Sequence, residues 1–270
     1  MPGCRWRSCL ALFLLLAAGC GGPGGLETIT VAGSTSVLPY VEYLAEEYMA
    51  ANPQVRVNVQ GGGSTAGLQA VMAGAADLGM ASRPLHPTEA GLTAITIAWD
   101  AIAVVVHPSN EVVSLSGEQI RAVFAGLVRD WSELGGPHRP VTVVSREEGS
   151  GTREAFTALV MGGLPTTDRA LVQDSNGAVR EVVAADPAAV GYLSLGLVDG
   201  RIRALAVDGE RPTARAVLAG EYRLARPFLL VRPAETGPVP REFLDFVLGP
   251  RGQSLLAEEG LVPVAGTGDR

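Results

Sequence analysis

The stretch TITVAGSTS occupies residues 28–36 and contains the unit from which the rest of the chain is built. Residues 28–32 are β-branched or small and apolar, a composition typical of a buried strand. A glycine and three hydroxyl residues follow directly, and from Val37 onward apolar residues recur at helical spacing until Asn52-Pro53 ends the pattern. The stretch therefore predicts a strand, a hydroxyl-rich turn and a helix.

The same alternation of strand and helix continues along the chain. Strands are predicted at residues 28–32, 55–59, 76–80, 102–106, 141–144, 190–193, 202–207 and 226–231. Helices are predicted at residues 37–51, 65–75, 116–125, 152–161, 177–186, 241–248 and 253–259. Strands that alternate with helices indicate an α/β fold with mainly parallel sheets flanked by helices.

Four of the predicted turns combine small and hydroxyl or amide residues at the start of a helix. They lie at residues 33–36, 63–65, 149–152 and 175–177. Glycine allows a ligand to approach the backbone closely, and the first turn of a helix offers unpaired N–H groups with a partial positive charge. In α/β folds such turns gather at the carboxyl edge of the sheet, which favours binding of a small oxyanion. Helix capping explains any single turn without a function, whereas four such turns favour a site.

Two arginines lie close to these turns in the predicted fold. Arg83 ends the third strand, and Arg146 lies four residues before Ser150. A planar guanidinium can bind a tetrahedral oxyanion through two parallel hydrogen bonds, although most arginines are solvated surface residues. The candidate ligand-binding residues are therefore Ser34, Thr35, Ser36, Ser64, Thr65, Arg83, Arg146, Ser150, Gly151, Thr152 and Asn176.

The first residues have the pattern of a lipoprotein signal peptide. Two arginines precede an apolar run at residues 10–18, which is about half as long as a membrane-spanning helix must be. Small residues then lead to Cys20, the expected site of lipid attachment. We expect residues 1–19 to be a signal peptide and residues 20–27 to be a flexible tether. An ordinary secretory signal with an incidental cysteine is the alternative.

Composition excludes several classes of function. All 21 basic residues are arginine, which excludes enzymes that need a lysine, such as P-loop NTPases and pyridoxal-phosphate enzymes. After removal of the signal peptide the chain has 19 basic and 28 acidic residues, a balance that disfavours nucleic acid as a partner. Only Cys20 remains among the cysteines, so we expect no internal disulfide and no cysteine metal site. We expect no cofactor and no metal.

At these residues the sequence resembles the phosphate-binding proteins of high-affinity phosphate importers, a branch of the type II periplasmic binding proteins. The resemblance spans residues 28–263, and its most specific part is Arg146-x-x-x-Ser150-Gly151-Thr152. The matching segments are residues 32–36, 61–67, 78–83, 145–153, 176–179, 189–192 and 243–253.

The resemblance implies a two-lobed type II periplasmic binding protein fold with the ligand cleft between two α/β lobes. The first lobe would comprise residues 28–107 and the return segment 223–270, and the second lobe would comprise residues 108–222. The chain would cross between the lobes near His107 and near Tyr222. Phosphate in the cleft would favour closure of the lobes.

The resemblance also implies a monomeric, extracytoplasmic binding protein without catalytic activity. Such a protein, held at the membrane by the lipid on Cys20, would capture inorganic phosphate and deliver it to the permease subunits of an ABC importer. Carried over residue by residue, the phosphate ligands would be Thr35, Ser36 and Ser64 from the first lobe, and Arg146, Ser150, Gly151 and Thr152 from the second.

One position departs from the long enteric-type members of this family. Those members have an aspartate that accepts the proton of hydrogen phosphate, and this chain has Arg83 there. The usual basis for rejecting sulfate is therefore in doubt. Glu147 or Glu148 is an alternative acceptor, although a loop carboxylate is more often a solvated residue.

Other functions fit the sequence less well. Residues 61–66 match a dinucleotide-binding fingerprint, but no acidic residue ends the next strand. A serine hydrolase would need a full Gly-x-Ser-x-Gly motif, which neither Ser64 nor Ser150 has. Molybdate, tungstate and sulfate remain alternative ligands, because helix N-termini serve every tetrahedral oxyanion. A surface phosphate sensor or adhesin without a role in transport also stays open.

Overall fold

The computed structural model describes residues 25–264 of the chain. The expected signal peptide at residues 1–19, the predicted lipid site Cys20 and most of the predicted tether lie outside the described residues. Between residues 25 and 264, no helix combines the length and the apolar composition that crossing a membrane requires.

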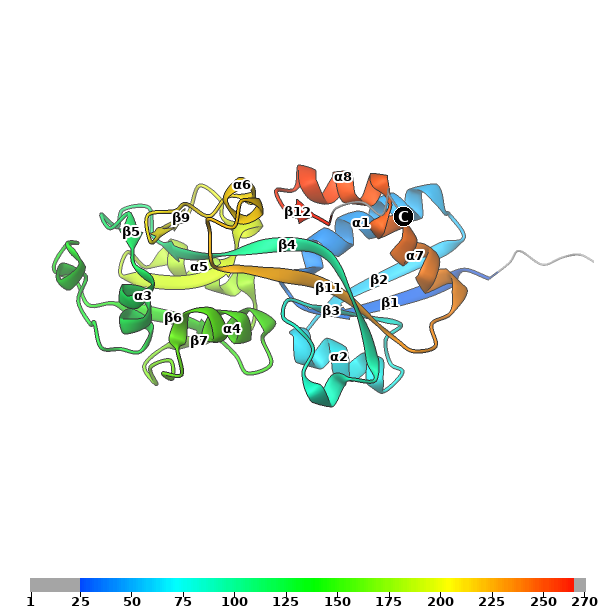
Figure 1. The fold of residues 1–270 in the computed structure, drawn as a ribbon, viewed down its shortest axis with the longest axis horizontal. Coiled ribbons are helices and arrows are strands. Elements are labelled where there is room, and N and C mark those ends of the chain that lie inside the picture. Colours follow the sequence, from blue (N-terminus) through cyan, green and yellow to red (C-terminus); the bar gives the residue numbers. More distant parts are fainter. Residues whose placement is uncertain (1–24, 265–270) are drawn as a thin grey trace, which may run out of the picture.

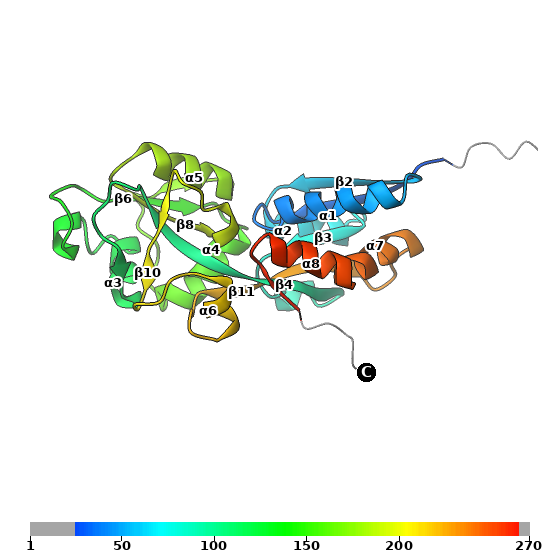
Figure 2. The ribbon, with the colours of Figure 1, turned by 90° about the horizontal axis from the view of Figure 1, so that it is seen from above.

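The described chain forms two bodies of strands and helices that are joined by two long strands (Figures 1 and 2). The first body contains β1 (Glu27–Gly33), α1 (Leu38–Ala51), β2 (Val55–Gly61), α2 (Ser64–Met72), β3 (Leu78–Ala81), η1 (Pro87–Glu89), α7 (Pro238–Leu248), α8 (Pro250–Glu258) and β12 (Val262–Pro263). The second contains β5 (Ser114–Leu115), α3 (Gly117–Phe124), η2 (Trp131–Leu134), β6 (Thr142–Arg146), α4 (Gly151–Phe156), η3 (Thr157–Met161), β7 (Leu171–Gln173), α5 (Asn176–Ala185), β8 (Ala189–Ser194), η4 (Leu195–Leu197), β9 (Arg203–Ala204), β10 (Ala206–Val207) and α6 (Ala214–Leu218). The joining strands are β4 (Leu92–Val106) and β11 (Ala225–Pro233).

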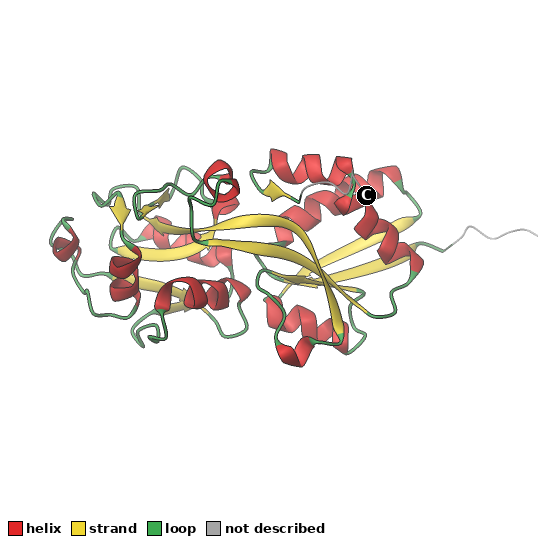
Figure 3. Cartoon of the chain, in the orientation of Figure 1, coloured by secondary structure: helices red, strands yellow, loops and turns green. Residues whose placement is uncertain are grey.

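Eight strands form one hydrogen-bonded path in the order β2-β1-β3-β11-β4-β8-β6-β7, β9 and β12 pair with β4 beside it, and β5 and β10 form a separate two-stranded sheet. Pairing is parallel inside each body, between β1 and its neighbours β2 and β3, and between β6 and its neighbours β7 and β8. Pairing is antiparallel wherever β4 or β11 takes part. Helices flank the strands in both bodies (Figure 3). The prediction of mainly parallel sheets therefore holds inside the bodies and fails at the strands that join them.

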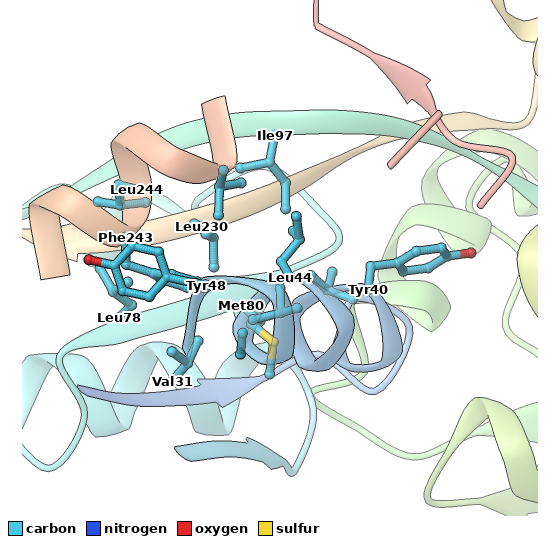
Figure 4. Close-up of a cluster of buried hydrophobic side chains, with 14 of the residues drawn as sticks. Val31, Tyr40, Leu44, Tyr48, Leu78, Met80, Ile97, Leu230, Phe243 and Leu244 are labelled. Carbon is cyan, nitrogen blue, oxygen red and sulfur yellow. The ribbon is translucent and has the colours of Figure 1, made fainter. Parts of the chain in front are cut away.

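Each body has a hydrophobic core of its own. The first core packs α1, α7 and α8 against β1 and β3, and Figure 4 shows Leu44, Tyr48 and Phe243 among its side chains. The second core contains aromatic residues that pack directly on one another, with the rings of Phe156 and Tyr192 stacked at 4.0 Å between centroids. Aromatic pairs at such distances stabilise a core beyond the burial of their area.

The two cores divide the joining strands at nearly the same level. On β4, Ala98 packs in the first core and Ala101 in the second. Leu224, directly before β11, packs in the second core, and Phe228 of β11 packs in the first. We propose that these positions are the boundaries between the two lobes. The proposed crossings lie several residues from the sequence-based expectations at residues 107 and 222.

A buried ion pair links the joining strands at this level. Asp100 of β4 lies opposite Arg226 of β11, and Asp100 Oδ2 accepts hydrogen bonds from Arg226 Nε and Nη2 at 3.0 and 2.9 Å. Ser194 donates to the other carboxylate oxygen at 2.9 Å. Burial raises the pKa of Asp100, and the charge of Arg226 and the hydrogen bond from Ser194 oppose that shift. The pair therefore links β4 and β11 at the proposed boundary between the lobes.

The sequence pattern misses part of the joining region. It predicts a strand only at residues 102–106, whereas β4 begins at Leu92. Residues 92–96 are not buried, and the buried Asp100 interrupts the apolar run, so the first half of β4 lacks the pattern of a buried strand. The predicted strand at residues 202–207 is divided into β9 and β10 at Leu205.

Candidate functional site

The candidate site lies where the carboxyl ends of the strands of the two lobes face each other. Three of its loops belong to the first lobe and follow β1, β2 and β3, and two belong to the second lobe and follow β6 and β7. Each predicted turn leads into a helix, as the strand-turn-helix pattern requires. Polar side chains that are at most 2 % exposed gather there, namely Ser34, Ser36, Ser64, Ser82, Arg146, Ser150, Thr152 and Asn176.

A chain of hydroxyl groups connects these loops. The Oγ of Ser34 lies 3.0 Å from that of Ser36 and donates to the Oγ of Ser82 at 3.0 Å. Ser82 in turn lies 3.5 Å from Ser64. The hydroxyl of Ser36 reaches across to Thr152 of the second lobe at 3.4 Å. Each hydroxyl can donate one hydrogen bond and accept others, so the chain can reorient toward an oxyanion.

Arg146 supplies the positive charge in this group. Its side chain is 1 % exposed at the end of β6, and Glu147 accepts hydrogen bonds from Nε and Nη2 at 2.9 and 2.8 Å. Nη2 also donates to Thr35 Oγ1 of the first lobe at 3.3 Å. Glu147 therefore fixes the Nε–Nη2 edge of the guanidinium, and the same Nη2 reaches the first lobe.

Asn176 completes the contacts across the cleft. With its amide oxygen turned toward the available donors, it accepts from Thr35 Oγ1 at 3.0 Å, from the Ser36 N–H at 3.3 Å and from Arg146 Nη1 at 2.8 Å. The Thr65 N–H donates to the Gly149 carbonyl at 3.1 Å, which is a further contact between the lobes. These contacts describe a closed arrangement in which both lobes contribute to one polar site.

Some hydroxyls at the site cap a helix, and others do not and remain available to a ligand. Ser150 caps α4 by accepting from the Arg153 N–H, and Ser175 caps α5 by accepting from the Ala178 N–H. The helices α1 and α2 have no side-chain cap at their first residue. In α1 the first-turn N–H groups bond to the carbonyls of Ser34 and Val37, and Pro39 has no N–H. In α2, within the described residues, the N–H groups of Ser64 and Ala66 bond to no backbone carbonyl and therefore remain donors for an anion. Capping accounts for Ser150 in part and for Ser34, Ser36 and Ser64 not at all.

Arg83 lies differently from the other candidate residues. Both terminal nitrogens of its guanidinium donate to Glu89 at 2.8 Å, and Nη2 also donates to Thr65 Oγ1 at 3.1 Å. Its Nε lies 2.8 Å from the carboxylate of Glu154. The guanidinium of Arg83 is therefore paired with carboxylates. Neither Arg83 nor Thr65 hydrogen-bonds to the chain of hydroxyls.

Ser82 is a site residue that the sequence-based selection misses. It follows β3 directly, is fully buried and bonds to both Ser34 and Ser64. The signal for it was present, because β1 and β3 are parallel neighbours and their carboxyl ends meet at one edge of the sheet.

The chemistry of the group is that of an anion receptor. It combines hydroxyls, backbone N–H groups and one guanidinium, and no carboxylate of residues 25–264 hydrogen-bonds to the hydroxyl chain. No cluster of three or more histidine, cysteine or acidic residues that could hold a metal occurs in the described part of the chain. Donors that converge from two lobes define a protein that binds a small oxyanion.

Comparison with known proteins identifies the family. A family model described as the PBP superfamily domain matches residues 19–251. The phosphate-binding protein PstS of Bacillus subtilis is 31% identical over 94% of this chain and 92% of that protein. A putative phosphate ABC transporter substrate-binding protein from Clostridium perfringens, solved with bound phosphate, is 38% identical with a TM-score of 0.86 over 88% of this chain and 100% of that one. An ABC-type phosphate transport receptor from Vibrio cholerae is 35% identical with a TM-score of 0.74, over 87% and 100% of the two chains.

The chain therefore belongs to the PBP superfamily, the class that its fold and site define. Within that class it belongs to the PstS-like phosphate-binding proteins. This confirms the resemblance seen in the sequence and the two-lobed α/β fold expected from it. The family consists of substrate-binding proteins, which confirms the expectation that the chain is not an enzyme.

Proposed function

We propose that this protein is an extracytoplasmic lipoprotein that captures inorganic phosphate and delivers it to the permease subunits of an ABC importer. The observation that carries the proposal is the convergence of Arg146 with the hydroxyls of both lobes. The similarity of the chain to phosphate-binding proteins supports it. In this proposal the acidic mature chain binds an anion through local donors rather than through its net charge.

The closed site explains how affinity arises without a metal. The terminal nitrogens of the Arg146 guanidinium and the N–H groups of Ser64 and Ala66 at the start of α2 would donate to phosphate oxygens. Charge-assisted hydrogen bonds contribute about 1.5–3 kcal/mol each, and micromolar binding needs about 8 kcal/mol. Five to eight bonds, as an order of magnitude, therefore suffice after the costs of ordering and desolvation.

Calorimetry of the purified mature protein tests the ligand. We expect phosphate to bind with micromolar or tighter affinity and sulfate to bind at least about tenfold more weakly. The same titration with arsenate, molybdate and tungstate compares the other tetrahedral oxyanions, which present similar acceptors to the same donors. Equal or tighter binding of sulfate or molybdate would remove the assignment of phosphate and leave the fold unaffected.

Closure of the lobes over the ligand is tested at Gly151. A Cβ at this position would lie 2.2 Å from Ser64 Oγ and 2.7 Å from Ser82 Oγ, both in the other lobe. Gly151→Ala should therefore weaken phosphate binding by about 1–3 kcal/mol, roughly five- to 150-fold, through overpacking of the closed state alone. Calorimetry measures the loss, and the melting temperature of the ligand-free protein should stay unchanged.

The matched control for this change is Gly177→Ala. Gly177 also lies in the first turn of a helix at the cleft, but a Cβ there would meet nothing closer than Ser175 Oγ at 4.0 Å. Wild-type affinity is expected for this variant. Equal losses in the two variants would show that the effect comes from the helix termini and not from contact between the lobes.

The proposed anchor is tested at Cys20, which lies outside the described residues. Because Cys20 is the single cysteine left after the expected cleavage, Cys20→Ser should move the protein from the membrane fraction to the soluble fraction. Fractionation of cells that express each form measures the change. Unaltered partitioning of the variant would rule out Cys20 as the anchor.

A further inference from the structure

Three charged side chains form a group beside the phosphate site that the proposed ligand contacts do not use. Arg83 lies in the first lobe after β3, and Glu89 ends the short helix η1 of the same lobe. Glu154 belongs to α4 of the second lobe. The side chains of Arg83 and Glu89 are 3% and 6% exposed, and that of Glu154 is 29% exposed. Two carboxylates from different lobes thus meet one buried guanidinium.

Arg83 is held rigidly within the first lobe. Glu89 accepts from Nη1 and Nη2 of Arg83 at 2.8 Å each, and Nη1 also donates to the Pro84 carbonyl at 2.9 Å. Glu89 is itself fixed, because it accepts from the His86 N–H at 2.7 Å. The paired hydrogen bonds from Arg83 lower the pKa of Glu89. These contacts all lie within the first lobe and do not depend on closure, and with them in place the Nε edge of Arg83 faces Glu154 of the second lobe.

Glu154 finds its partners only across the cleft. Its Oε2 lies 2.8 Å from Arg83 Nε and 2.7 Å from His86 Nε2, and both of those residues belong to the first lobe. Separation of the lobes would break both contacts while leaving the pair of Arg83 and Glu89 intact. An interaction that exists in one of two conformations shifts the population toward that conformation by its own free energy.

We propose that Glu154 is a positioning residue that latches the lobes in the closed conformation by pairing with Arg83 and His86, and thereby slows the release of phosphate. This proposal rests on the proposed function, because it takes phosphate to be the ligand. The three residues of the latch are not among the proposed phosphate contacts. It gives Arg83 a role at the position where the enteric-type relatives have an aspartate. The arginine contributes to closure of the lobes and not to recognition of the anion.

The direction in which phosphate binding changes when Glu154 is neutralised distinguishes the latch from a purely electrostatic effect of its charge on the anion. Glu154 carries a negative charge next to an anion site, so its removal would strengthen phosphate binding if its charge acted only through the field. The latch requires the opposite result. In Glu154→Gln we expect the dissociation rate constant of phosphate to rise about three- to thirtyfold, with the association rate constant within about twofold of wild type.

The matched control is Glu181→Gln. Glu181 is a carboxylate of α5 that pairs with Arg201 at 2.9 Å inside the second lobe, so the change removes the same charge and a pair of the same kind. Wild-type rate constants are expected for the control. In an Arg83→Gln background, Glu154→Gln should lose most of its effect, because the partner is gone. Should Arg83→Gln fail to fold, the rate constants of the two glutamate variants still decide the question.

The experiment is stopped-flow binding of phosphate to the mature protein, combined with fluorescence energy transfer between dyes at positions 72 and 127. Met72 and Leu127 are exposed, at 51% and 69%, and lie in different lobes. Dissociation of Glu154→Gln at the wild-type rate, or tighter binding by this variant, would overturn the latch. If the wild type bound no phosphate, the proposed function would fail, and an unaltered distribution of distances in ligand-free Glu154→Gln would then overturn the latch independently.

Discussion

Asp100→Ala is expected to destabilise the protein by about 3–5 kcal/mol, because it leaves a buried arginine without its counter-charge. Arg226 is 1% exposed and donates two hydrogen bonds to the Asp100 carboxylate. Arginine does not lose its proton in proteins, so the positive charge would remain buried and unpaired. Urea denaturation of the ligand-free mature protein, followed by circular dichroism, measures the loss.

A double replacement distinguishes the ion pair from the packing of the joining strands. Asp100→Leu together with Arg226→Met removes both charges. The free energy of unfolding of this double variant should be much closer to the wild-type value than that of Asp100→Ala. Glu181→Ala serves as the control, because it removes a carboxylate from an exposed pair and should leave the urea midpoint unchanged. A wild-type midpoint for Asp100→Ala would mean that the pair contributes nothing to holding β4 and β11 together.

The local units of this fold could be predicted from the sequence because each unit is encoded within about 25 residues. The strand at residues 28–32, the turn at residues 33–36 and the helix that follows correspond to β1, the loop after it and α1. Hydrophobic period and turn residues fix such units locally. The gathering of the turns at one edge then follows from parallel pairing inside each lobe.

The partners of the charged residues could not be predicted in the same way. The pairing of Arg83 with Glu89 and Glu154 depends on how η1 folds back and on how α4 of the other lobe approaches. The pairing of Asp100 with Arg226 joins residues 126 positions apart. No local pattern encodes a contact of that kind. The sequence therefore indicates which charged residues stand at unexpected positions, and only the structure shows which partner each of them has.

The same distinction applies to the candidate site. The turns predict that hydroxyls and N–H groups converge, but they do not say which hydroxyls cap a helix and which remain for the ligand. Ser150 and Ser34 look alike in the sequence, and only the structure separates the cap of α4 from the chain of hydroxyls. Buried polar groups of this kind are determined by tertiary contacts between elements rather than by local propensity.

Arg146→Ala is expected to weaken phosphate binding about thirty- to a thousandfold, which corresponds to about 2–4 kcal/mol. Arg146 is the cation that joins the polar groups of both lobes, through Thr35 and Asn176. Arg146→Lys should recover the affinity only in part, because an ammonium group lacks the fork that donates two parallel hydrogen bonds. Thr35→Val and Ser150→Ala should each cost less, about 1–2 kcal/mol, since neighbouring backbone donors remain.

The ligand-free protein tells whether Arg146 binds the ligand or supports the fold. The sequence alone suggests a solvated side chain, whereas the closed structure buries it against Glu147. Glu147 is 28% exposed and can return to water when the arginine is removed, so the melting temperature of ligand-free Arg146→Ala should change little. Arg201→Ala removes the same charge from an exposed pair and should bind phosphate as the wild type does. Loss of the ligand-free fold would make Arg146 a structural residue, and a wild-type affinity would place it outside the site.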